Sequence, residues 1–209
     1  MKHYALIITS LLSLMGCADG NQATSHQCVV PLENGFSSID SLNNCTVAVA
    51  FVCENINRQE KSLDITAYRE FLYDSVTINR LQKGDTLMLK GEPIVVDSLE
   101  RRDGFVGING GIERRGVDLT AHEGGTYRAT TFNNHSIYQE IGNTTLKLAD
   151  DFILIDCGED FSDPCDTISE NQYTYLSNLP ENRRDFFQMN TRIRIESGLV
   201  KEINRRWIP

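Results

Sequence analysis

Residues 126–157, TYRATTFNNHSIYQEIGNTTLKLADDFILIDC, carry the pattern that decides the fold class. Short apolar or β-branched runs alternate here with turn residues, in the order TYRATTF, NNHS, IYQEI, GN, TTLKLA and FILIDC. Val, Ile, Thr and the aromatic residues favour strands, whereas Asn and Gly favour turns. The stretch therefore predicts a series of short strands with no helix between them.

The same spacing of apolar runs and turns extends back over residues 75–121. The chain ends in NTRIRIESGLVKEINRRW, where Ser197-Gly198 separates two alternating arms and predicts a hairpin with Ile193 and Ile195 facing inward. Since no α-helical period intervenes, a doubly wound parallel sheet is disfavoured. The expected fold is mainly β: a single antiparallel β-sandwich or barrel-like domain over residues 28–209, with one or two short helices and a C-terminal β-hairpin.

Two segments fit short helices. In residues 62–73, SLDITAYREFLY, Ser62 can act as N-cap and Leu63, Ala67 and Phe71 fall on one helical face. Residues 178–187 begin with a capping Asn and carry a Pro in the first turn, which predicts a second helix. By contrast, the run SVTINRL that begins at Ser75 and the run CTVAVAFVC over residues 45–53 are expected to be strands.

The N-terminus has the organisation of a signal peptide. A short cationic start is followed by YALIITSLLSLM, twelve residues without charge. As a helix this run would rise about 18 Å, which is short of the roughly 30 Å hydrocarbon core of a bilayer. Residues 1–16 are therefore expected to direct export rather than to span the membrane.

The residues Leu14-Met15-Gly16-Cys17 resemble the lipobox of bacterial lipoproteins, in which Leu is followed by Ala, Ser or Thr, then Gly or Ala, then Cys; only Met15 departs from this pattern. The resemblance implies that Cys17 becomes the N-terminus and carries lipid. It also implies an anchored bacterial envelope protein, and Ala18 in place of Asp favours the outer membrane over the inner. Residues 17–27 would form a flexible tether to a domain in the periplasm or at the cell surface.

The alternative is an ordinary signal peptide cleaved after Ala18, with Gly16 and Ala18 as the small residues of the cleavage site. Both routes remove Cys17 from disulfide formation and leave five cysteines, so one odd thiol is expected. Cys157 and Cys165 bracket the polar segment GEDFSDP and are expected to pair. We expect Cys28 to pair with Cys53, with Cys45 as the alternative partner.

The charge balance excludes some partners. With 20 Lys and Arg against 29 Asp and Glu, the net charge is −9. Nucleic-acid binding requires a basic surface and is not expected. Arginine pairs at positions 101–102, 114–115, 183–184 and 205–206 would form an anion site only if folding brought them together.

Residues 150–170 contain eight acids and no Lys or Arg. Because convergent carboxylate oxygens suit a hard cation, this segment is a candidate calcium site, with Asp156, Glu159, Asp160 and Asp163 as first candidates. The spacing is not that of an EF-hand, and solvation of an acidic loop is the plainer interpretation.

His122, Glu123 and His135 form the other candidate site. The metalloprotease motif HExxH needs a second His four residues after the first, and position 126 is Thr. Without a catalytic motif, the leading hypothesis is a non-enzymatic envelope lipoprotein that binds or supports another envelope or periplasmic component, with a periplasmic immunity-type inhibitor as one version. The alternatives are a metal-dependent periplasmic hydrolase that uses His122, Glu123 and His135, or a surface module that binds Ca²⁺.

Overall fold

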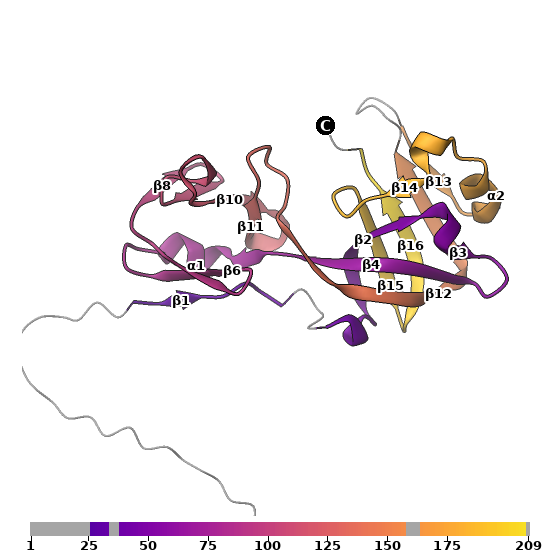
Figure 1. The fold of residues 1–209 in the computed structure, drawn as a ribbon, viewed down its shortest axis with the longest axis horizontal. Coiled ribbons are helices and arrows are strands. Elements are labelled where there is room, and N and C mark those ends of the chain that lie inside the picture. Colours follow the sequence, from indigo (N-terminus) through magenta and orange to yellow (C-terminus); the bar gives the residue numbers. More distant parts are fainter. Residues whose placement is uncertain (1–25, 34–37, 158–163, 208–209) are drawn as a thin grey trace, which may run out of the picture.

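A computed structural model describes residues 26–33, 38–157 and 164–207. The fold is mainly β with two short α-helices, which confirms the fold class expected from the sequence. The described residues gather around two hydrophobic cores, one in each of two lobes joined by extended strands (Figure 1). The sequence pattern alone did not indicate this division into two cores.

One lobe, here called the barrel lobe, is a closed ring of five strands. β4 pairs with β2 on one side and with the first half of β12 on the other. The second half of β12 runs parallel to β16, and β15 connects β16 to β2. The strands of the ring are β2 (Cys45–Val52), β4 (Ser62–Glu70), β12 (Tyr138–Cys157), β15 (Thr191–Glu196) and β16 (Leu199–Arg205).

The order of strands in this ring is that of a known fold. When the five strands are numbered in chain order, hydrogen-bonded neighbours around the ring follow the order 1-2-3-5-4, and strand 4 pairs with strand 1 to close it. The third and fifth strands are parallel to one another. The helix α2 (Gln172–Ser177) falls between the third and fourth strands. This is the topology of the OB-fold, a five-stranded Greek-key barrel. Because one fold serves many activities, the topology by itself identifies no ligand.

β12 explains how the ring closes. The sequence pattern predicts three strands over residues 137–157, with a turn at Gly142-Asn143, but the structure has one strand of 20 residues. The pairing shifts register between Glu140 and Gly142, where Gly142 has a φ of 136°, and again between Leu148 and Ile153. Such irregularities bend a strand, so β12 reaches two different neighbours.

The second lobe, here called the inserted lobe, is formed by the chain between β4 and β12 together with the N-terminal strand β1 (Cys28–Val29). A five-stranded sheet in the order β5-β11-β10-β9-β8 and a three-stranded sheet in the order β1-β6-β7 share its core. Its elements are β1 (Cys28–Val29), β5 (Leu72–Asp74), α1 (Ser75–Arg80), β6 (Thr86–Leu89), β7 (Glu92–Val95), β8 (Leu99–Arg102), β9 (Phe105–Ile108), β10 (Val117–His122) and β11 (Thr126–Thr130).

The remaining elements are short. β3 (Ile56–Asn57), β13 (Cys165–Ile168) and β14 (Asp185–Phe186) extend the sheet of the barrel lobe. Turns of 3₁₀ helix occur at Ile39–Ser41, Cys53–Asn55, Ile112–Arg114, Glu123–Gly125 and Glu181–Arg183. No helix within the described ranges is long and apolar enough to cross a bilayer.

The start of the folded body is fixed by a buried carboxylate. Asp85 accepts hydrogen bonds from the backbone N–H of Gln27 at 2.9 Å and from that of Gln82 at 2.8 Å. β1 then pairs parallel to β6, with Cys28 opposite Thr86. The N-terminal end of the described chain is thus held by the inserted lobe from Gln27 onward.

The helix predicted over residues 62–73 is wrong, because Ser62–Glu70 forms strand β4. Leu63 and Ala67 fit both a helical and a strand period, but Ile65 is also buried, as alternation requires. Backbone pairing with strands on both sides decides the outcome. A helix would leave the edges of β2 and β12 that face β4 unpaired.

The strand predicted at SVTINRL is also wrong, since Ser75–Arg80 forms helix α1. Asp74 caps this helix: its carboxylate accepts from the Thr77 N–H at 2.8 Å and from the Thr77 hydroxyl at 2.7 Å.

The helix predicted over residues 178–187 is replaced by two shorter elements. Glu181–Arg183 forms a 3₁₀ turn and Asp185–Phe186 forms β14. Phe186 pairs with Phe51 of β2, and their rings stack at 4.4 Å, which pulls this segment into the sheet. The helix α2 lies before the predicted segment. It ends at Ser177, and its C-cap is Asn178, the residue at which the predicted helix was to begin.

The C-terminal hairpin is confirmed. β15 and β16 pair antiparallel around Ser197 and Gly198, and Ile193 and Ile195 are buried. Arg192 and Arg194 are half-buried rather than fully outward-facing, because each forms an ion pair with a Glu.

The disulfide between Cys157 and Cys165 is confirmed; it joins directly opposed residues of β12 and β13. The predicted pairing of Cys28 with Cys53, and its alternative with Cys45, are wrong. Cys28 lies on β1 of the inserted lobe, whereas Cys45 and Cys53 pack in the core of the barrel lobe, and all three are free thiols.

Counting thiols tests this arrangement. Alkylation of the denatured, unreduced mature protein should modify three cysteines, and prior reduction should raise the number to five because the disulfide adds two. In the native protein the exposed Cys28 should react first, since burial raises the pKa of the Cys45 and Cys53 thiols and lowers their thiolate fraction. Mass spectrometry reads both results; a single modified cysteine before reduction would show a second disulfide.

Candidate functional site

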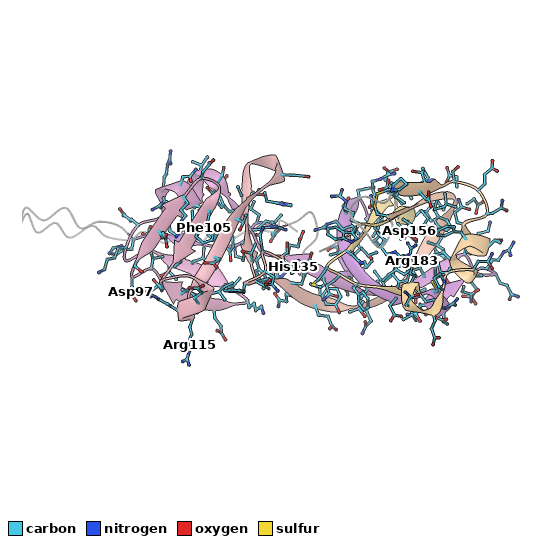
Figure 2. The ribbon with its side chains drawn as sticks, turned by 90° about the horizontal axis from the view of Figure 1, so that it is seen from above. Asp97, Phe105, Arg115, His135, Asp156 and Arg183 are labelled. Carbon is cyan, nitrogen blue, oxygen red and sulfur yellow. A yellow bond between two sulfur atoms is a disulfide. The ribbon has the colours of Figure 1, made fainter. Side chains whose placement is uncertain are left out.

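A cavity of about 700 Å³ lies at the junction of the two lobes. Its position is marked by His135, which Figure 2 shows between the lobes. Both lobes contribute side chains, and so do the strands that connect them. The lining residues are Thr46, Glu70, Leu72, His122, Glu123, Arg128, Asn133, Asn134, His135, Ser136, Tyr138, Met189, Arg192, Arg206 and Trp207.

One wall is the connection between β11 and β12. The Thr131 N–H donates to the His135 carbonyl at 2.7 Å, and the His135 N–H donates to the Thr131 hydroxyl at 3.2 Å. Asn134 adopts a left-handed conformation with φ 59°, which Asn tolerates better than most residues. These contacts make a tight turn that places His135 and Ser136 at the cavity.

Arg128 on β11 supports this turn. Its guanidinium donates to the Ser136 hydroxyl at 3.2 Å and to the Asn134 carbonyl at 3.0 Å. Its Nε is buried and has no hydrogen-bond partner among the described residues. The contacts of Arg128 are therefore with neutral oxygen atoms, and its positive charge is not matched by a carboxylate in the described part of the chain.

The opposite wall comes from the barrel lobe. Arg192 of β15 donates to the Glu70 carboxylate at 2.7 Å, and Glu70 is the cross-strand partner of Tyr138. Burial opposes ionisation of Glu70, but the charge of Arg192 and hydrogen bonds from Ser136 and Arg192 outweigh it and lower the Glu70 pKa. Burial also raises the pKa of the Tyr138 phenol. At neutral pH Glu70 and Arg192 are therefore charged, whereas the Tyr138 phenol is neutral.

The cavity has a local excess of positive charge. Its lining contains three arginines and two glutamates, in a chain of net charge −9. Arg192 and Glu70 neutralise one another, and Glu123 is exposed. Arg206 is exposed, and within the described ranges no carboxylate lies at ion-pair distance from it. Arg128 and Arg206 are thus two cations that face one cavity from different lobes.

His122, Glu123 and His135 are brought together, in that all three line this cavity. They come from the end of β10, the following 3₁₀ turn and the β11–β12 connection. Within residues 26–33, 38–157 and 164–207, no three His, Cys, Asp or Glu side chains are grouped closely enough to hold a metal ion. The three residues of the hydrolase hypothesis therefore line one cavity, but the described residues do not group them closely enough to act together as metal ligands.

Of the four calcium candidates, Asp156 is the one that the structure describes. Glu159, Asp160 and Asp163 lie outside the described residues. Asp156 is buried, and its carboxylate accepts two hydrogen bonds from Arg205, at 2.7 and 2.6 Å. Arg183 approaches the same group at 3.0 Å. Because guanidinium groups already occupy both oxygens, and would repel a cation, Asp156 is a structural residue rather than a calcium ligand.

The Asp156 cluster joins several elements of the barrel lobe. Asp156 and Arg205 are opposite one another in the parallel pair of β12 and β16. The Tyr175 hydroxyl of α2 donates to the carboxylate at 3.0 Å, and the Arg205 guanidinium lies over the ring of Phe186 at 4.1 Å. One buried charge pair thus ties α2, β14 and the closing strand to β12.

Folding does not assemble the arginine pairs noted in the sequence into one anion site. Arg205 and Arg183 meet at Asp156, whereas Arg206 points to the junction cavity with two arginines that belong to no pair, Arg128 and Arg192. Arg205 is the last residue of β16 and is buried, whereas Arg206 follows the strand and is exposed. Sequence reasoning missed Arg128, Arg192 and Glu70, because only the pairing of distant strands brings them to the cavity.

Comparison of the chain with protein-family models, with curated proteins and with solved structures found no match.

The Asp156 cluster makes a prediction about stability. Replacing Asp156 by Asn leaves the buried Arg205 without its counter-charge and should lower the free energy of unfolding by about 3–5 kcal/mol. Asp166 is the matched control, since it lies opposite Asp156 on β13 but is exposed, and Asp166→Asn should change stability by no more than about 0.5 kcal/mol. Urea denaturation measures both; equal effects of the two substitutions would contradict the role of the cluster.

Proposed function

We propose that this chain is an exported, lipid-anchored binding protein of the bacterial cell envelope, without enzymatic activity. It holds another envelope or periplasmic component at the cavity between its lobes. The observation that carries the proposal is the composition of that cavity, which draws side chains from both lobes and from the strands that join them. Binding sites occur preferentially where domains or lobes meet.

Export and anchoring rest on the N-terminal residues. A signal pattern over residues 1–16 is followed by the lipobox-like Leu14-Met15-Gly16-Cys17, and lipid on Cys17 would hold the protein at the membrane, with the outer membrane favoured. The disulfide between Cys157 and Cys165 is in keeping with an oxidising compartment. The tether expected over residues 17–27, whose last residue Gln27 is held by Asp85, would place the folded body in the periplasm or at the cell surface.

A role in binding is supported by apolar side chains near the cavity. Met189, which lines the cavity, is 40% exposed, and Phe132, in the turn between β11 and β12, is 71% exposed. Exposed Met and aromatic residues are enriched where proteins contact partners. The net charge of −9 adds long-range attraction for a basic partner, as an immunity-type inhibitor of a basic toxin would need, although the cavity lining itself has a local excess of positive charge.

Crosslinking in intact cells tests the proposal. A photoreactive residue at Met189 should give one dominant adduct, because this position borders the cavity. The control is Val95 on β7, which is 53% exposed and lies outside the cavity lining, and it should give no such adduct. Cys17→Ser should release the protein from the membrane fraction and abolish the adduct. Equal labelling from Met189 and Val95, or a Cys17→Ser protein that stays membrane-bound, would contradict the proposal.

The competing function is a metal-dependent periplasmic hydrolase, favoured by the presence of His122, Glu123 and His135 in the same cavity. Elemental analysis of the purified protein distinguishes the two. The binding protein should contain no stoichiometric zinc, and His122→Ala should not alter its metal content. One equivalent of zinc that is lost in His122→Ala would favour the hydrolase. A Ca²⁺-binding role for Glu159, Asp160 and Asp163 remains a separate prediction.

A further inference from the structure

We propose that the junction cavity binds a small organic anion, with Arg128 and Arg206 holding its phosphate or carboxylate group. This inference rests on the proposed binding function and names the chemistry of the ligand. It begins from the charge of the cavity, which is opposite in sign to that of the chain as a whole. Local positive charge in an acidic protein concentrates anions at that place.

The arginines divide into one that is neutralised and two that are not. Arg192 is held by Glu70 at 2.7 Å and has its charge matched. Among the described residues, the guanidinium of Arg128 forms hydrogen bonds with the Ser136 hydroxyl and the Asn134 carbonyl and with no carboxylate, and its buried Nε has no partner there. Burying part of a guanidinium without a counter-charge is unfavourable. An anion in the cavity would supply the missing charge.

Geometry favours a planar or tetrahedral oxyanion over a halide. Guanidinium groups bind phosphate and carboxylate through two parallel N–H donors, and Arg128 is already oriented by its contacts with the turn over residues 131–137. His122 and His135 add ring nitrogens that can donate to further oxygen atoms, and Asn133 adds an amide. The cavity therefore offers a cluster of donors drawn from several elements.

The rest of the lining indicates that the ligand also has an apolar or ring portion. Tyr138, Trp207, Leu72 and Met189 share the cavity with the charged groups. The volume of about 700 Å³ is far larger than a single phosphate and lies within the range of small-molecule sites, roughly 300–1,000 Å³. An inorganic ion alone would leave the aromatic and apolar surfaces uncovered.

The experiment compares three probes of similar shape on the full-length protein in neutral detergent: phenyl phosphate, benzoate and phenol. Calorimetric titration at constant ionic strength should show that at least one of the anions binds, and that phenol binds at least about tenfold more weakly, since one charge-assisted hydrogen bond contributes about that factor. Phenyl phosphate and benzoate together distinguish a phosphate-bearing from a carboxylate-bearing ligand. Binding of neither anion above the level of phenol would overturn the proposal.

Variants locate the bound anion. Arg206→Gln should weaken binding of the anion about tenfold. It should not disturb the fold, since Arg206 is exposed and makes no ion pair with a described carboxylate. Arg128→Gln should weaken binding at least as much, and Arg128→Lys should restore part of it. Arg115, which is exposed, is absent from the cavity lining and lies on the lower edge of the inserted lobe in Figure 2, gives the matched control Arg115→Gln, which should bind as the unmodified protein does.

The outcomes separate this inference from the proposed function. Anion affinity that is unchanged in both Arg206→Gln and Arg128→Gln would place the binding elsewhere and overturn the inference, even where crosslinking at Met189 succeeds. Arginine-dependent anion binding without a crosslinked adduct would support the inference and contradict the macromolecular partner.

Discussion

The double pairing of β12 is the constraint on which the rest of the structure depends. Its first half is antiparallel to β4 and its second half is parallel to β16, so one strand closes the ring of the barrel lobe. Without this closure β4 and β16 would be edge strands with unpaired backbone groups. The same strand begins at the cavity, with Tyr138, and ends at the disulfide, with Cys157. Barrel closure and cavity formation therefore rest on one element.

A buried charge pair secures the far end of that element. Asp156 and Arg205 face one another in the parallel pair of strands, and the guanidinium lies over the ring of Phe186. Such a pair adds little net stability over apolar packing, but its geometry disfavours other registers, because a slip would bury each charge alone. We infer that this charge pair fixes the register of β16 against β12.

The cavity follows from how the two lobes are connected. The segments that meet there include the end of β4, the turn between β11 and β12, and the chain around β15 and the C-terminal end of β16. Glu70 and Arg192 bridge two of these segments and neutralise each other, which leaves the charges of Arg128 and Arg206 directed at the open space. The strand pairing that builds the barrel brings Arg192 to Glu70, and it thereby influences the net charge of the cavity lining.

Local sequence determined those features whose physical cause is local. The alternating runs with Asn and Gly turns specified a mainly β fold, Ser197-Gly198 specified the terminal hairpin, and the short polar segment between Cys157 and Cys165 specified their disulfide. Each depends on residues within about a dozen positions of one another, so propensity and spacing suffice. The export and lipidation that we propose for the N-terminal residues likewise rest on a local pattern, over residues 1–17.

Only the tertiary structure decided the features that depend on distant pairing. Residues 62–70 are a strand because two neighbours pair with them, and Cys28 is far from Cys53 because β1 joins the inserted lobe. Asp156 changed from a candidate metal ligand to a buried ion-pair partner because β16 brings Arg205 opposite it. The cavity combines residues as far apart in sequence as Thr46 and Trp207. No local pattern encodes such contacts, since they arise only when non-adjacent strands close a ring.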